Sequence, residues 1–175
     1  IGNAIVDVLC KVSDDFLIKN SLVKGTMKLV EEDEFKKLLS SLKIEETISG
    51  GSIANSIVGL SQLGNPVSFI GKVNNDELGN KYEKSLTNEK VKYNYKKKEE
   101  TIPTGTCLIL ITPDSERTMC TFLGTAGKIN KNDVSSDVIN FSKSLGKIIV
   151  VTRGEKGAVA INGDEIVECG IKQGL

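Results

Sequence analysis

The chain has 175 residues, which is enough for one domain with a substantial hydrophobic core. Its 23 Lys and Arg residues equal its 23 Asp and Glu residues, so no net charge draws it to nucleic acid or to an anionic membrane. Histidine is absent, which excludes a Ser-His-Asp triad, a Cys-His pair and a histidine-ligated metal site within these residues.

The cysteines and the hydropathy pattern bear on the compartment. Four cysteines occur far apart, without C-x-x-C spacing and beside apolar residues: Cys10, Cys107, Cys120 and Cys169. This pattern is typical of buried, reduced thiols, which suits the cytosol. No apolar run approaches the roughly 20 residues that span a bilayer, and there is no signal peptide, although the chain opens at Ile1 without a methionine. We therefore expect a cytoplasmic protein with no membrane or nucleic-acid partner.

Apolar periodicity predicts strands that alternate with helices along the chain. We expect strands over residues 1–9, 25–30, 67–72, 107–112, 117–123, 147–151 and 157–161. We expect helices after Ser13 and over residues 31–42, 52–64, 76–88 and 132–143. Turns are predicted at Pro113-Asp114-Ser115 and Asn162-Gly163-Asp164. This order indicates an α/β sheet with helices on both faces and a small attached sheet.

The segment Gly50-Gly51-Ser52-Ile53-Ala54-Asn55 is the most informative stretch of the sequence. Two glycines precede an apolar helical run, so backbone N–H groups at the helix start can hold an oxygen-rich ligand. Asn55, one turn into the helix, offers both a donor and an acceptor to hydroxyl groups. A polyol or a ribose would suit such a site. A plain strand-to-helix turn with Ser52 as the N-cap explains these six residues equally well.

Five motifs occur along the chain in one order: Gly2-Asn3-Ala4-Ile5-Val6-Asp7, the Gly50 to Asn55 junction, residues 69–79, Glu116-Arg117-Thr118 and residues 151–157. In this order they resemble the ribokinase-like (PfkB) family of carbohydrate and nucleoside kinases. The first two look most like its adenosine kinase branch. The resemblance implies a ribokinase-like three-layer α/β/α sandwich with a small β-sheet lid, and residues 1–175 would form a single, apparently incomplete domain.

The resemblance also implies roles for particular residues. The family's matching aspartate holds the acceptor's hydroxyls together with the diglycine and its asparagine, which assigns Asp7, Gly50, Gly51 and Asn55 to substrate binding. Asp7 is expected at the carboxyl end of the first strand, where open α/β sheets place ligands; a carboxylate that caps a turn is the alternative.

Near the other end of the chain, Thr152 and Gly154 are assigned to the nucleotide, although a hairpin turn without a ligand explains that segment nearly as well. Asn74 stands where the family usually has a glycine, so we expect left-handed backbone there and a structural role for the loop. The role of Arg117 is left open.

The catalytic motif of the family, Gly-Ala-Gly-Asp, does not occur in the 175 residues, so no catalytic residue is assigned. The interval from Gly127 to Ile148 is also shorter than the resemblance predicts. Three explanations are open: the sequence joins only the ordered parts of a longer protein, the chain is truncated, or it is a natural degenerate homologue. We favour the first.

The expected activity is an ATP- and Mg²⁺-dependent kinase, with or without a monovalent cation, that acts on a primary hydroxyl of a nucleoside or sugar, adenosine first. A ribokinase- or fructokinase-like sugar kinase and a non-catalytic nucleoside- or sugar-binding module are the alternatives. Lid strands are expected within residues 8–30 and 91–112, at 27–30, 93–95 and 107–112. The protein would be a monomer or a homodimer formed through the lid.

Overall fold

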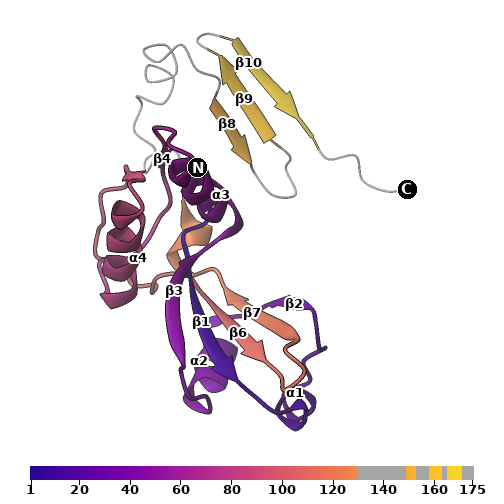
Figure 1. Cartoon of the computed structure of the whole chain (residues 1–175). Helices are drawn as coiled ribbons and strands as arrows, with labels where there is room; N and C mark the ends of the chain where they lie inside the picture. Colours follow the sequence, from indigo (N-terminus) through magenta and orange to yellow (C-terminus); the bar gives the residue numbers. More distant parts are fainter. Residues whose placement is uncertain (130–148, 153–157, 163–164, 171–175) are drawn as a thin grey trace.

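The computed structural model describes residues 1–129, 149–152, 158–162 and 165–170, and Figure 1 shows their arrangement. Its helices are α1 (Asp14–Lys19), α2 (Glu32–Ser40), α3 (Ser52–Gln62), α4 (Glu77–Asn88) and the 3-10 helix η1 (Gly124–Lys128). The first five strands are β1 (Ile5–Lys11), β2 (Met27–Leu29), β3 (Glu46–Gly50), β4 (Ser68–Phe69) and β5 (Lys92–Tyr93). The others are β6 (Thr106–Ile111), β7 (Arg117–Phe122), β8 (Ile149–Thr152), β9 (Ala158–Asn162) and β10 (Glu165–Cys169).

The largest sheet has five strands in the order β2-β7-β6-β1-β3. It is mixed, because β1 pairs parallel with β6 and β2 parallel with β7, while the β1–β3 and β6–β7 pairs are antiparallel. Strands β4 and β5 form a parallel two-stranded sheet, and β10-β9-β8 form an antiparallel three-stranded sheet. The predicted helix over residues 132–143 and the turn residues 163–164 lie outside the described residues.

The predicted start of the sheet is wrong by several residues. β1 runs from Ile5 to Lys11, and Asp7 is its third residue rather than its last. Strand β3, for which no bounds were predicted, pairs with it along the edge of the sheet. This strand is hard to find in the sequence, because Glu-Thr-Ile-Ser-Gly contains one large apolar residue and most of it is exposed or half-buried.

The strand predicted over residues 67–72 shrinks to the two residues of β4. The backbone after β4 leaves the sheet because its carbonyls have partners elsewhere: Ile70 accepts from the Gly2 N–H, and Lys72 accepts from the Thr125 hydroxyl. Gly71 accepts from the Tyr93 hydroxyl. These residues therefore join the amino end of the chain to η1 instead of extending a strand.

The two faces of the five-stranded sheet differ in how they are covered. On one face, α1 and α2 pack on alternate residues of β1, β6 and β7 and form an apolar cluster that includes Val8, Leu108 and Phe122. A second cluster, centred on Tyr82 and Phe69, packs α4 and the β4–β5 sheet against the amino end of β1. The smaller cluster on the opposite face contains residues of β1, β6 and η1, and within the described part of the chain no residue of α1–α4 belongs to it.

Side-chain caps fix the starts of two helices. The Ser13 hydroxyl accepts a hydrogen bond from the Phe16 N–H at the start of α1, as the sequence predicts. The Asp76 carboxylate does the same for the Gly79 N–H at the start of α4. It also accepts from the backbone N–H and the hydroxyl of Thr104, so one carboxylate joins α4 to the segment that leads into β6.

Asn74 has a structural role, but not the one predicted for its backbone. Its φ angle is not positive, so the expectation of left-handed geometry is wrong. Its side chain instead holds a neighbouring loop: Nδ2 donates to the carbonyls of Glu100 (2.9 Å) and Ile102 (3.0 Å). Oδ1 accepts from the N–H groups of Glu100 (2.9 Å) and Asn75 (2.7 Å). The Asn74 amide therefore fixes the loop at Glu100 and Ile102 through hydrogen bonds that a glycine could not make.

We accordingly expect Asn74→Gly to destabilise the fold, although glycine is the usual residue at this position in the family that the sequence resembles. The change removes four hydrogen bonds of a half-buried side chain and should lower the free energy of unfolding by about 2–4 kcal/mol. Asn75→Gly, at the exposed neighbour, is the matched control. Urea unfolding of the two variants measures the difference. Equal losses of unfolding free energy would contradict the structural role of the Asn74 side chain.

Candidate functional site

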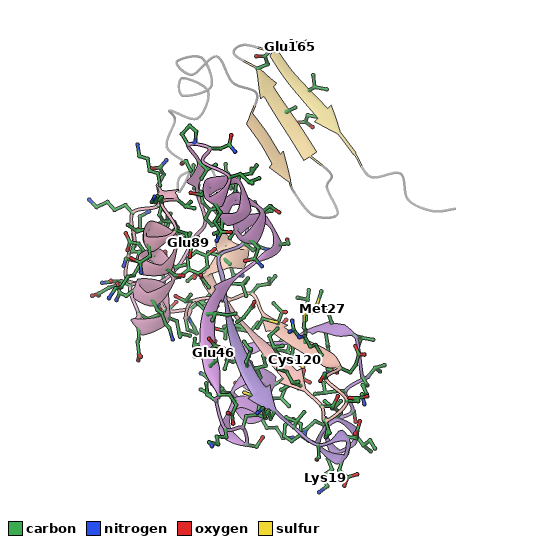
Figure 2. All side chains as sticks on the ribbon, in the orientation of Figure 1. Lys19, Met27, Glu46, Glu89, Cys120 and Glu165 are labelled. Atoms are coloured by element: carbon green, nitrogen blue, oxygen red, sulfur yellow. The ribbon has the colours of Figure 1, made fainter. Side chains whose placement is uncertain are left out.

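The open face of the five-stranded sheet carries the predicted substrate residue. Strand register places one row of side chains across this face, since directly paired residues of neighbouring strands point to the same side. The row runs in the order Ile48, Asp7, Cys107, Thr121 and Leu29. The side chains of this face that are exposed by 36–58% include Met27, Leu29, Ile48 and Met119. In Figure 2, Met27 lies at the β2 end of the sheet and Glu46 at the β3 end.

Asp7 is the one acidic residue of β1, the strand that lies between β6 and the edge strand β3. Its side chain is half-buried, and burial raises the pKa of its carboxyl group. Within the described ranges, no hydrogen bond or ion pair to this carboxylate is recorded. A carboxylate that is partly desolvated and has no such protein partner can accept hydrogen bonds from ligand hydroxyls. The alternative of a turn-capping carboxylate is wrong, because Asp7 lies inside a strand with partners on both sides.

The diglycine lies directly against Asp7. A Cβ atom built on Gly50 would be 2.2 Å from Asp7 Oδ2, so only glycine leaves room for the carboxylate. Gly51 has φ +95°, and a Cβ there would be 2.7 Å from the backbone carbonyl oxygen of Asn3. Both glycines are therefore required by close approach, and Gly50 lies against Asp7, while the assignment of the three residues to substrate binding stays a prediction.

Helix α3 begins at this point without a side-chain cap. Its N-cap is Gly51, with no side-chain hydrogen bond, so the alternative that Ser52 caps the helix is wrong. The first N–H groups of α3 are consequently left to solvent or to a ligand. Asn55 lies in the first turn, where its N–H donates to the Gly51 carbonyl at 2.9 Å. Its side chain is exposed, so its NH₂ group can donate to a ligand and its carbonyl oxygen can accept from one.

No described contact links the predicted nucleotide residues, Thr152 and Gly154, to the site around Asp7. Thr152 is the last residue of β8 and is in register with Ala158 of β9. Gly154 lies outside the described residues. Across the described ranges, no group of three or more His, Cys, Asp or Glu side chains could hold a metal ion. The assignment of Thr152 and Gly154 to ATP binding stays a prediction.

The predicted lid strands fall in two sheets. β2 and β6 belong to the five-stranded sheet, whereas β5 pairs with β4, so residues 93–95 do not share a sheet with the other two segments. Arg117 opens β7 and is exposed, in register with Ile111. Whether the five-stranded sheet closes over a ligand stays a prediction. None of the described helices is long and apolar enough to cross a membrane.

Cys107 is a residue of the site that motif analysis missed. It is adjacent to Asp7 across the β1–β6 pair and only 5% exposed, and its Sγ accepts from the Thr121 hydroxyl at 3.1 Å. No local signal marks it, because Thr106–Ile111 is a nearly continuous buried run and the pairing with β1 is a contact between distant segments. Cys10 and Cys120 are also buried free thiols, as predicted, while the side chain of Cys169 lies outside the described residues.

Burial, and to a lesser extent the nearby charge of Asp7, raises the pKa of the Cys107 thiol to about 11. At pH 7 about one thiol in 10⁴ would then be ionised, so alkylation should be slow and should speed up as the pH rises toward 11. Peptide mapping after iodoacetamide treatment at several pH values measures this rate. Cys107→Ser should abolish the modified peptide, and rapid modification of Cys107 in the folded protein at pH 7 would contradict the expected pKa.

Comparison with known proteins identifies relatives over most of the described chain. The profile of the pfkB family carbohydrate kinases matches residues 27–144. The guanosine-inosine kinase of Escherichia coli K12 is 28% identical over 153 residues, which cover 83% of this chain and 35% of that protein. The chain thus spans about a third of the length of this curated relative.

Solved structures show the same fold. The adenosine kinase of Sinorhizobium meliloti superimposes with a TM-score of 0.73 at 23% identity, covering 97% of this chain and 78% of that one. The Anopheles gambiae adenosine kinase, solved with P1,P4-di(adenosine-5) tetraphosphate, has a TM-score of 0.68 at 31% identity, covering 78% and 42%. The mixed sheet with its helices therefore has the ribokinase-like α/β fold.

Proposed function

Because the chain belongs to the pfkB family of carbohydrate kinases, we propose that it forms the acceptor-binding part of a kinase that phosphorylates a nucleoside, with a purine nucleoside as first candidate. The single observation that carries this proposal is the Asp7 carboxylate: half-buried, against Gly50, on an open sheet face. Two relatives support the class of acceptor, since one is named a guanosine-inosine kinase and the other an adenosine kinase.

The residues of this chain would act chiefly by binding and orienting the acceptor. A carboxylate can accept hydrogen bonds from two adjacent hydroxyls, so Asp7 would hold the diol of a ribose. The Asn55 amide and the uncapped N–H groups of α3 would contact the remaining oxygens. The fixed geometry would direct the primary hydroxyl toward the phosphoryl donor, which is how phosphoryl-transfer enzymes gain most of their rate.

The apolar side chains around Asp7 favour a nucleoside over a free sugar. Ile48 lies on one side of Asp7, and Leu29 and Met119 lie on the strands beyond Cys107. These side chains offer the flat apolar surface that a purine ring can cover, whereas a free sugar would leave it in water. Covering it would also exclude water from the reacting oxygens.

ATP would supply the phosphoryl group, and Mg²⁺ would neutralise charge on its phosphates. Thr152 and Gly154 are the proposed contacts to the nucleotide. The protein would act in the cytoplasm as a monomer or as a homodimer, and its partners would be small molecules.

The test is ADP production by the protein expressed from its complete gene, with ATP and Mg²⁺, across adenosine, guanosine, inosine, ribose and fructose. Turnover with a purine nucleoside alone is the expected result. Turnover with a free sugar alone would move the protein to the sugar kinases. Saturable binding of an acceptor without any turnover would overturn the kinase proposal and leave a binding module.

A further inference from the structure

Tyr82 lies on α4 directly behind the diglycine. It is 0% exposed, and its hydroxyl donates a hydrogen bond to the Gly50 carbonyl at 3.4 Å. Burial, together with the negative charge of Asp7, raises the pKa of its phenol, so the hydroxyl stays protonated and remains a donor. A buried hydroxyl without a partner is unfavourable, which ties the position of this ring to the Gly50 carbonyl.

A second contact from the same helix reaches the neighbouring residue of β3. The hydroxyls of Ser85 and Ser49 are 2.6 Å apart and share a hydrogen bond. Tyr82 and Ser85 are three residues apart, so they lie on one face of α4. Their partners, Gly50 and Ser49, are consecutive in β3. Helix α4 therefore holds the last two residues of the strand that ends at the diglycine.

Gly50 transmits this position to Asp7. The carboxylate rests over the Gly50 Cα so closely that a methyl group there would be 2.2 Å from Oδ2. A displacement of the Gly50 backbone would change the wall against which the carboxylate is packed. The ring of Tyr82 packs against Phe69 and Tyr93, and its hydroxyl contacts the site through the Gly50 carbonyl.

We propose that Tyr82 is a positioning residue: its hydroxyl fixes the Gly50 carbonyl and so holds the Asp7 carboxylate and the diglycine in the arrangement that receives two hydroxyls of the acceptor. This inference rests on the function proposed above. The contact sets how well the acceptor is bound and oriented, and it takes no part in binding ATP.

The experiment is steady-state kinetics of the full-length protein with Tyr82→Phe, which keeps the ring in the core and removes only the hydroxyl. We expect the acceptor KM to rise roughly three- to tenfold, as for the loss of one hydrogen bond, with the ATP KM unchanged. In an Asp7→Asn background the same change should add less than about twofold, because Tyr82 acts through Asp7.

Tyr93→Phe is the matched control. Tyr93 belongs to the same aromatic cluster, and its hydroxyl also donates to a glycine carbonyl, that of Gly71 at 2.5 Å, but not to the diglycine. Tyr93→Phe should lower thermal stability at least as much as Tyr82→Phe, because the hydrogen bond that it removes is shorter, without changing the acceptor KM.

Three outcomes would overturn the positioning role while the wild type turns over its acceptor. They are an unchanged acceptor KM in Tyr82→Phe, an equal rise in Tyr93→Phe, or a full additional effect of Tyr82→Phe in the Asp7→Asn background. A wild-type protein that neither binds nor phosphorylates any acceptor of the panel would overturn the proposed function, and the positioning role with it. The wild-type assay thus distinguishes the two failures.

Discussion

Asp7→Asn should lower kcat/KM for the acceptor roughly ten- to hundredfold, which corresponds to the loss of one charge-assisted hydrogen bond of about 1.5–3 kcal/mol. The amide has the same shape as the carboxylate, but one of its two positions can no longer accept a hydrogen bond. The measurement is acceptor-dependent ADP release by wild type and variant, with acceptor-independent ATP hydrolysis as the internal reference. A variant with wild-type kcat/KM would remove Asp7 from the site.

The same variant should not be less stable than the wild type at neutral pH. Burial raises the pKa of Asp7 in the folded state, so the folded protein binds the proton more readily than the unfolded chain does. Stability from this group is therefore lost as the pH rises through the interval between the unfolded and folded pKa values, and it is regained on acidification. Asp7→Asn removes this dependence, and its melting temperature at pH 7 should equal or exceed that of the wild type. A clear fall in melting temperature would indicate that the carboxylate stabilises the fold.

The protonation state should also appear in the kinetics. Only the ionised carboxylate accepts hydrogen bonds with both oxygens, so the acceptor KM of the wild type should rise as the pH falls below the raised pKa of Asp7. In Asp7→Asn the acceptor KM should no longer depend on pH in this range. An identical pH profile in both proteins would assign the titration to another group.

Gly50→Ala should remove acceptor binding while leaving a folded protein. The new methyl group would be 2.2 Å from Asp7 Oδ2, and a half-buried side chain can yield where backbone cannot, so the carboxylate is displaced from the site. We expect acceptor affinity to fall at least about a hundredfold, as for the loss of the Asp7 contacts themselves. Isothermal titration with the acceptor identified by the activity panel measures this loss.

Gly59→Ala is the matched control for this substitution. Gly59 lies in the second half of α3, away from the diglycine, and a Cβ atom there would meet no atom within 4 Å. Alanine is a better helix former than glycine by about 1 kcal/mol, so this variant should be more stable than the wild type and bind the acceptor normally. If both variants bind normally, the close contact between Gly50 and Asp7 has no functional role.

The sequence predicted the helices on either side of the site, because short-range patterns determine where a helix begins. The diglycine followed by an apolar helical run predicted the start of α3, and the periodicity of residues 76–88 predicted α4. The ribokinase-like α/β fold followed from the order of the motifs, and the structural comparison confirms it.

The rest depends on contacts between distant segments, which local patterns do not contain. Asp7 was expected at the end of a strand, but pairing with β3 and β6 extends β1 four residues beyond it. Asn74 was interpreted by its backbone preference, whereas its amide bonds to a loop about 26 residues later. Tyr82 belongs to none of the motifs, and the packing of α4 on β3 brings its hydroxyl to Gly50.

The pairing of β1 with a strand on each side also fixes which of its residues face the site. Asp7 reaches the open face because it is an odd-numbered residue of a strand whose even-numbered residues, such as Val8 and Cys10, lie in the helix-covered core. A slip of β1 by one residue against both neighbouring strands would reverse this alternation. The slip would place the Asp7 carboxylate in the core and an aliphatic side chain on the open face. The register of β1 is therefore as necessary to the site as the identity of Asp7.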